Sequence, residues 1–432
     1  MFGGLFRTTS LAALLAAGLV YGGASAQAAD LGGDCCADLE ERVAELEATT
    51  ARKGNRKVSL EVSGQVNEMV FYWDDGVESN VYQATNTFSS SRFRMKGGAK
   101  INDEWSAAYL IEIDFEGAIG DGVDQGLPGP AGTQGDDATR QPRLRHSAWQ
   151  LKSKRLGNIW VGQYSFATDD ITAAVDVAGI GTAAAANMNS SAGAGLFHRN
   201  SNGTLTNTRL NAFWQFLDTD RQNIIRYDSP TLAGFTLSAA WGEDDVWDVA
   251  LRYAGEFNGI KMAAALGYYE DRDESSAAIV RNGASQNFDD IRAAASVLHE
   301  PTGLFVNGAY IHREFDNVAL GDVTYWYLAS GISRKFFPIG KTAIWGEYAE
   351  IDGPLDGNIV TADNNFAGLA VGATIIDSQQ SHWGIGVQQY IDAAAMQVYL
   401  GYRNIEADVS TAAASTNFND IDIVYTGARI QF

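Results

Sequence analysis

From about residue 58 onward, apolar and polar side chains alternate with a period of two along much of the chain. Residues 91–101 place Phe, Met, Gly, Ala and Ile on one face, and Arg92, Arg94 and Lys96 on the other. Successive side chains of a strand point to opposite faces, so this pattern predicts strands with one apolar and one charged face. A dry core would not accept a whole row of unpaired cations. The charged face is therefore expected to meet water.

Sixteen segments show this pattern, and tight turns alternate with long polar links between them. Beyond the first 26 residues there is no run of about 18 apolar residues that would form a spanning helix. A closed barrel crosses a membrane without such a helix, because its backbone groups are paired between strands. An even strand number, with short turns at one rim and long loops at the other, is typical of outer-membrane barrels. The segments are residues 58–73, 91–101, 104–116, 143–153, 157–164, 222–228, 234–242, 247–257, 260–269, 288–299, 303–314, 322–335, 341–350, 381–391, 395–406 and 420–432.

The predicted fold class is all-β: a 16-stranded antiparallel transmembrane β-barrel over residues 58–432, with a short N-terminal helical, coiled-coil-like segment. One of the sixteen segments alternates less regularly than the others. In residues 143–153, Trp149 and Leu151 share the parity of Arg145, so the sequence does not assign one charged face there. A soluble all-β fold, such as a surface adhesin, remains the alternative.

The N-terminus has the order of a secretory signal. Residues 1–26 carry one cation, Arg7, then an apolar core, then small residues that suit cleavage at 26–29. Residues 27–57 are expected to be a periplasmic segment in which residues 38–53 form a short amphipathic helix. Whether this helix forms a trimeric coil or a loose tether stays open. So does the state of Cys35 and Cys36, which are free, locally oxidised or cross-linked between chains.

Charge and motif content narrow the function. Acidic residues outnumber basic ones 53 to 31, for a formal net charge of -22, which excludes the basic face that nucleic-acid binding needs. The five histidines have no metal-ligand spacing, and there is no G-x-S-x-G nucleophile elbow. Paired carboxylates such as Glu112 and Asp114 alternate along one strand, as acids on a wet wall do. The sequence predicts no enzyme and no cofactor.

Three segments resemble a known family. The run Ser91-Arg92-Phe93-Arg94-Met95-Lys96-Gly97, the run RQNIIRYDSP at residues 221–230, and the terminal Phe432 are similar to motifs of Gram-negative trimeric porins, most closely the alphaproteobacterial branch. The resemblance implies a homotrimer in the outer membrane, with a water-filled pore in each barrel. It implies a constriction loop folded inside the barrel, here at about 165–205. Phe432 resembles the signal that the outer-membrane assembly machinery reads.

The same resemblance suggests how the pore selects solutes. Channel selectivity follows from the narrowest width and the charge found there. The expected function is passive diffusion of ions and small hydrophilic solutes; the alternative is a solute-selective channel with an internal binding site. Acidic loops, including residues 117–137, are expected to meet lipopolysaccharide through divalent cations. The expected basic wall of the pore is Arg92, Arg94, Lys96, Arg145, Arg221 and Arg226, and its acidic side is Asp169, Asp170, Asp176, Glu112 and Asp114.

Overall fold

The computed structural model describes most of the chain after residue 56. The predicted signal peptide, the predicted helix at 38–53, and Cys35 and Cys36 lie outside the described residues. Within the described part of the chain, no helix is both long and apolar enough to cross a membrane. The described residues are 57–115, 120, 122–125, 142–186, 191–214, 221–243, 245–272, 280–281 and 284–432.

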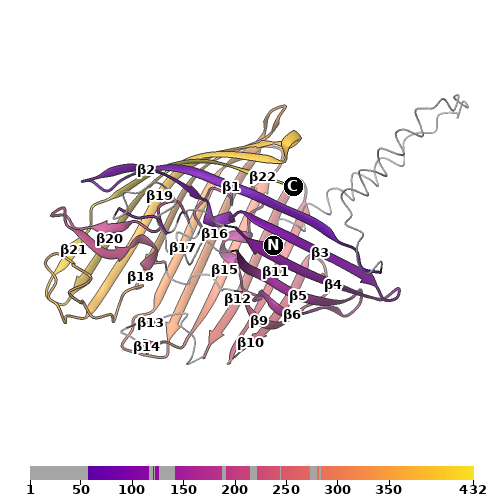
Figure 1. Ribbon diagram of the computed structural model, residues 1–432, viewed down its shortest axis with the longest axis horizontal. Coiled ribbons are helices and arrows are strands. Elements are labelled where there is room, and N and C mark those ends of the chain that lie inside the picture. The colour runs from indigo at the N-terminus through magenta and orange to yellow at the C-terminus, as the bar shows by residue number, and fades with distance from the viewer. Residues whose placement is uncertain are drawn as a thin grey trace, which may run out of the picture.

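The chain folds into one antiparallel sheet that closes on itself (Figure 1). The sheet has 18 strands, of which β2 and β21 are short additions, so 16 strands build the wall. The first and last of these, β1 and β22, pair from Gln65–Gln431 to Asp74–Asp422, which closes the barrel. The predicted 16-stranded barrel is confirmed. The wall strands are β1 (Glu61–Asp74), β3 (Arg92–Lys100), β4 (Trp105–Asp114), β5 (Arg143–Ser153), β6 (Gly157–Ser165), β9 (Arg221–Asp228), β10 (Phe235–Gly242), β11 (Val246–Phe257), β12 (Ile260–Asp271), β15 (Phe288–His299), β16 (Leu304–Phe315), β17 (Val323–Phe337), β18 (Gly340–Asp352), β19 (Ile375–Ile391), β20 (Met396–Thr411) and β22 (Ile421–Gln431).

The strand that follows β1 is interrupted. β2 (Ser79–Thr85) pairs with the second half of β1 and β3 pairs with its first half, while the 3-10 turn η1 (Thr87–Ser89) lies between them. The backbone N–H of Asn67 donates to the hydroxyl of Ser91 at 3.0 Å, which satisfies a β1 group at the interruption. The alternation in the sequence predicted β3 but missed β2, because the polar run at residues 86–91 breaks the period.

A β-bulge explains the irregular parity of β5. Glu112 pairs with His146 and Ile113 pairs with Leu144, so Arg145 is the extra residue of the bulge. A bulge places two residues opposite one and shifts the alternation beyond it. Arg145 and His146 therefore both face inward, whereas Trp149 faces outward and is 52% exposed.

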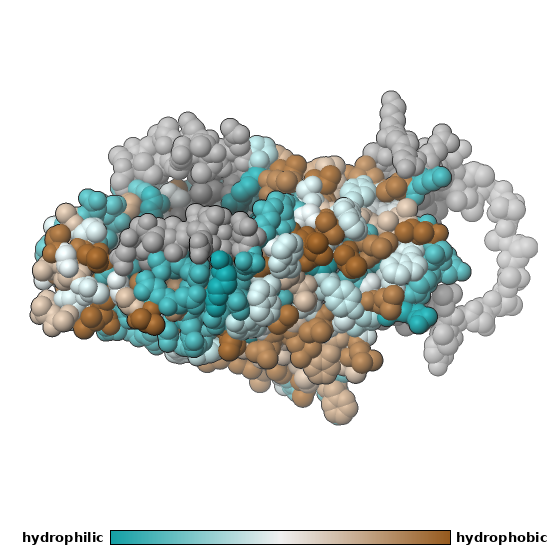
Figure 2. Space-filling model, turned by 90° about the horizontal axis from the view of Figure 1, so that it is seen from below, coloured by the Kyte–Doolittle hydropathy of each residue, from teal (hydrophilic) through white to brown (hydrophobic). Residues whose placement is uncertain are grey.

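Outward side chains of the wall are apolar, as the alternation predicted. Leu251, Leu400 and Ile385 are all more than 40% exposed on the outer surface. Outward aromatic rings pair across neighbouring strands, as in Trp326–Tyr348 and Trp383–Tyr402, with ring centroids 4.9 and 5.2 Å apart. Figure 2 shows apolar side chains gathered over the middle and right of one face, beside a polar region to the left. The apolar outward residues form the surface that is expected to meet lipid.

A long segment between β6 and β9 packs against the inward side of the wall. It contains α3 (Ile171–Ala174), β7 (Phe197–Arg199), β8 (Leu205–Arg209) and η4 (Leu210–Ala212). We call its described residues, 166–186 and 191–214, the inserted segment. Tyr390 donates to the carbonyl of Gly179 at 2.5 Å, and Tyr425 to that of Ala183 at 2.8 Å. The predicted loop at 165–205 falls largely within this segment. The remaining short elements are β13 (Val280–Arg281), β14 (Ala284–Ser285), η5 (Asp392–Ala394) and β21 (Ser415–Asn417).

Replacing Leu400 with arginine tests which face meets lipid. A cation on the lipid side at mid-depth is expected to lower the free energy of unfolding by about 2–4 kcal/mol, whereas the loss near an interface is about 0–1 kcal/mol. Urea unfolding in liposomes measures both Leu400→Arg and the control Ile376→Arg, an exposed residue near the end of β19. Equal losses in the two variants would contradict the assignment.

Candidate functional site: an arginine–carboxylate cluster on the inner wall

The inserted segment covers one part of the inner wall and leaves another part wet. Inward side chains of β17–β22, such as Ser333, Trp345 and Arg403, are buried. By contrast, the side chains of Arg94, Lys96 and Arg143 are 39%, 48% and 66% exposed. Water therefore reaches the inner wall along β3–β5.

Three arginines converge there on one carboxylate, Glu112. Arg94 and Glu112 are cross-strand partners on β3 and β4, and the Arg94 Nε donates to Glu112 Oε2 at 2.6 Å. The bulge brings Arg145 Nε to Glu112 Oε1 at 2.8 Å, and Arg92 Nη1 lies 3.4 Å from the same oxygen. The Glu112 side chain is fully buried beneath these guanidinium groups. Its charge is stabilised by donors on several sides.

A second carboxylate, Asp114, extends the cluster toward the strand end. Arg143 Nη2 and Arg145 Nη1 lie 3.0 and 3.4 Å from Asp114 Oδ2. Arginine keeps its proton in proteins, so Arg92, Arg94, Arg143 and Arg145 face two carboxylates and leave an excess of positive charge. The expected basic wall thus gathers at Arg92, Arg94 and Arg145. Glu112 and Asp114 differ from the expectation of an acidic side, because cross-strand pairing places them on the same wall as the arginines.

The other expected basic residues form their ion pairs with carboxylates other than Glu112 and Asp114. Arg221 Nη2 lies 3.5 Å from Asp169 of the inserted segment. Arg226 pairs with Asp228 at 2.9 Å and donates to the carbonyl of Phe166, which fixes the start of the inserted segment. Lys96 pairs with the exposed Glu61 at 2.9 Å, away from Glu112.

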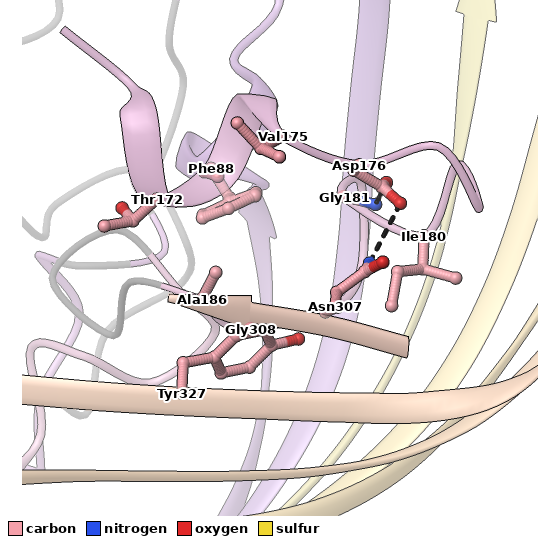
Figure 3. Close-up of a pocket in the computed structure, with 12 residues that line it drawn as sticks. Phe88, Thr172, Val175, Asp176, Ile180, Gly181, Ala186, Asn307, Gly308 and Tyr327 are labelled. Carbon is pink, nitrogen blue, oxygen red and sulfur yellow. Dashed lines mark hydrogen bonds between the residues drawn. The ribbon is translucent and has the colours of Figure 1, made fainter. Parts of the chain in front are cut away.

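The aspartates of the inserted segment do not form one row. Asp170 lies beside Asp169; desolvation raises the pKa of the Asp170 carboxyl group, and the charge of Asp169 adds to this. Asp176 turns toward β16, where it accepts from Asn307 Nδ2 at 3.0 Å and from the backbone N–H of Gly181 at 2.7 Å (Figure 3). The pocket beside it has a volume of about 10 Å³, room for about one water molecule. Asp176 is thus a structural anchor and does not face the arginines.

Sequence reasoning missed two sets of buried ion pairs on the inner wall, of which the Glu347–Arg403 pair also contacts the inserted segment. On β18 and β20, Glu347 accepts from Arg403 Nε at 2.8 Å, and Arg403 also donates to the carbonyl of Ala183. On β15 and β16, Asp290 pairs with Arg292 and Arg313 at 2.7 and 2.6 Å. The period of two puts these residues on the inward face of their strands, but only the strand register shows which charges meet. Within the inserted segment, burial lowers the pKa of His198 to about 3.

Glu112, His146 and Ser165 lie at distances similar to those in a catalytic triad, but their surroundings differ from those of an active site. His146 Nδ1 lies 3.5 Å from Glu112 Oε1, and its Nε2 lies 3.2 Å from the hydroxyl of Ser165. Ser165 is buried, and arginines occupy both carboxylate oxygens of Glu112. Because a substrate has no access to this serine, the contacts serve to hold β4, β5 and β6 together.

The comparisons with known proteins agree with this architecture. A family model described as Gram-negative porin matches residues 10–353, most of the chain. The chain belongs to the Gram-negative porin family, and it forms a porin channel of the outer membrane. A comparison with curated proteins gives no match.

Solved structures of the same fold include two named outer-membrane proteins. An anion-selective porin from Comamonas acidovorans has a TM-score of 0.56 and 16% identity, with 87% of this chain and 100% of that chain covered. OmpT of Vibrio cholerae, folded in vitro, has a TM-score of 0.52 and 12% identity, with 88% and 99% covered. Its trimer form has a TM-score of 0.51 and 12% identity, with 87% and 99% covered. At these identities the likeness is one of fold.

Replacing Glu112 with glutamine tests the cluster. Loss of the buried charge leaves three arginines facing each other, so the free energy of unfolding should fall by about 2–3 kcal/mol, less than for a fully buried pair because Arg94 is partly exposed. The reversal potential in a KCl gradient should show a higher selectivity for anions than in the wild type. The exposed pair Glu61–Lys96 supplies the control: Glu61→Gln should change stability by less than about 1 kcal/mol. If the two variants behave alike, Glu112 does not organise the cluster.

Proposed function

We propose that this porin is a passive channel for ions and small hydrophilic solutes, in which Arg92, Arg94 and Arg145 line the narrow part. The observation that supports this proposal is the water-exposed arginine–carboxylate cluster on β3–β5, whereas the inserted segment buries the inner wall of β17–β22. In this proposal residues 165–205 narrow the lumen, and residues 1–26 direct export and are removed.

The chemistry of the cluster favours small anions. Selectivity in a channel depends on charge at the constriction, and binding must be weak enough for release. Guanidinium groups of Arg92 and Arg94 offer charge-assisted hydrogen bonds to a passing anion, while Glu112 and Asp114 reduce the net charge and prevent trapping. The anion-selective porin from Comamonas acidovorans has a similar fold, which agrees with this preference.

Neutralising two arginines tests the proposal. In Arg92→Gln/Arg94→Gln, the ion preference should shift toward cations and single-channel conductance should rise, because the positive charge and two bulky groups are removed. Planar-bilayer recordings with a salt gradient measure both quantities.

Arg155 in the turn between β5 and β6 is exposed, so Arg155→Gln should leave both quantities unchanged. Wild-type selectivity and conductance in the double variant would remove Arg92 and Arg94 from the constriction.

We also propose that the protein is a homotrimer of the alphaproteobacterial branch of porins. The outward carboxylate of Glu68 on β1 supports a contact with another subunit at this strand. Glu68 faces outward between Val66 and Val70, which are 52% and 43% exposed. It accepts from the side chains of Gln83, Thr85 and Ser91 at 2.9–3.1 Å. A charge amid apolar outward residues is unfavourable against lipid, so this face fits a subunit interface better.

Replacing Glu68 with leucine distinguishes the two surroundings. If Glu68 lies at a subunit interface, Glu68→Leu should lower the temperature at which the trimer dissociates in detergent by several degrees, because a polar contact is lost. Semi-native electrophoresis after stepwise heating measures this temperature. Glu314 of β16 is also exposed and provides the control Glu314→Leu. An unchanged or more stable trimer in Glu68→Leu would place Glu68 against lipid.

Two further contacts belong to this proposal. Phe432 is exposed at the barrel end, where its backbone N–H and C=O pair with Gly64. This leaves its ring accessible as a signal for the assembly machinery during insertion.

Outward acids near the other strand ends, among them Glu314 and Glu406, would bind divalent cations that bridge to lipopolysaccharide phosphates. Asp124 of the acidic loop instead pairs with Arg209 at 2.8 Å. Asp121, Asp136 and Asp137 lie outside the described residues.

A further inference from the structure

Among the ten tryptophans, Trp160 has an unusual location. Trp149, Trp241 and Trp383 are exposed on the outer surface, where an apolar ring is stable against lipid. Trp73, Trp214 and Trp345 lie inside the barrel but are buried beneath other groups. Trp160 also faces inward, yet it is only half-buried. It therefore presents an indole surface toward the wet part of the lumen.

Strand register fixes the direction of this side chain. Trp160 of β6 is the cross-strand partner of Gln150 on β5 and of Arg226 on β9. Its neighbour Ile159 is 41% exposed on the outer surface, so the alternation turns Trp160 inward. The indole stacks on Tyr164 with ring centroids 4.3 Å apart and an interplanar angle of 11°. The Tyr164 ring in turn lies 5.2 Å from the ring of His146, which contacts Glu112.

The inner wall beside Trp160 has a small side chain, Ala108, and a cation, Lys152. Across β5 and β4 the same row continues through Gln150 to Ala108, a small residue. Lys152 lies diagonally from Trp160, since it pairs with Asn158, and such diagonal neighbours are about 7–8 Å apart, within reach of long side chains. Lys152 is exposed and has no ion pair among the described residues.

These groups combine two kinds of attraction. The stacked rings hold the indole rigid and give it a flat face, which favours other planar rings over puckered ones. The ammonium group of Lys152 attracts a negative substituent, and the amides of Gln150 and Asn158 provide hydrogen bonds. A planar ring with a carboxylate matches all of these groups, whereas a neutral sugar leaves the ammonium unused.

We propose that Trp160 and Lys152 form a subsite inside the channel for planar, ring-bearing anions, with aromatic carboxylates as the substrate class. The inference rests on the proposed function only in that the lumen must conduct anions. A solute passes the Arg92–Arg94 cluster, rests on the indole with its carboxylate toward Lys152, and leaves because only one ring face and one ammonium group hold it. Binding is weak and reversible, and no bond is made or broken.

The wild-type protein gives the first test. Benzoate and cyclohexanecarboxylate have the same charge and nearly the same size, but only benzoate is flat. Each is added to single channels in a planar bilayer carrying KCl, and the concentration that halves the chloride current is measured. Benzoate is expected to block at about threefold to tenfold lower concentration. Equal blocking concentrations would overturn the proposal without any variant.

Variants then assign the preference to these residues. Trp160→Ala should remove the difference between the two anions, Trp160→Phe should retain most of it, and Lys152→Gln should weaken the block by both. Trp149→Ala is the matched control, because Trp149 lies on the adjacent strand but faces outward. Normal KCl conductance in each variant establishes that the barrel is intact. A benzoate preference that survives in Trp160→Ala would overturn the assignment.

Failure of the proposed function has a different signature. If the chain forms no anion-conducting pore, chloride current is absent in the wild type and no block is measured. If only the arginine cluster is misassigned, Arg92→Gln/Arg94→Gln retains wild-type ion selectivity while the benzoate preference still depends on Trp160.

Discussion

The structure depends on one constraint: backbone groups that cross an apolar layer must find their partners within the protein. A sheet satisfies this only when its edges meet, and the long pairing of β1 with β22 joins them. Closure of the barrel also fixes the direction of the side chains. Alternate side chains of each strand point to lipid and to the interior, so Leu400 faces out and Arg403, three residues further along β20, faces in. Even the interrupted second strand obeys the constraint, because Ser91 supplies an acceptor to β1 at the interruption.

A closed barrel of this size is hollow, and the inserted segment decides how much of it stays open. Its carbonyl groups accept hydrogen bonds from inward side chains of the wall, including Ser333, Tyr390 and Tyr425. The wall beneath it is therefore buried, and charges such as Glu347 and Arg403 are paired there as burial requires. Charges along β3–β5 remain wet. This asymmetry places the excess of positive charge at Arg92, Arg94, Arg143 and Arg145 on one side of the lumen.

The alternation in the sequence predicted all 16 wall strands, because a period of two is a local property of the chain. It predicted the inward direction of Arg92, Arg94 and Glu112 for the same reason. It could not predict that these residues form one cluster, since cross-strand partners depend on register, which a single strand does not encode. The alternation did not predict the inward direction of Arg145, because the β-bulge there depends on how β5 pairs with β4. Asp176 was expected on the acidic side of the pore, but its partner Asn307 lies far along the chain, and such contacts leave no local pattern.

Family resemblance and geometry contribute different parts of the account. Membership in the Gram-negative porin family establishes the channel, and the structure shows which side of the lumen carries the arginine cluster and where Trp160 lies. The central claim is that each wall strand has one face toward lipid and one toward the interior of the barrel, and that water reaches the interior face near β3–β6. Cysteine scanning of residues 158–161 in a Cys35→Ser/Cys36→Ser background measures it most directly. A charged, membrane-impermeant thiol reagent should modify positions 158 and 160 rapidly, and positions 159 and 161 should react only with a lipid-soluble maleimide. Uniform reaction, or the reverse alternation, would contradict the account.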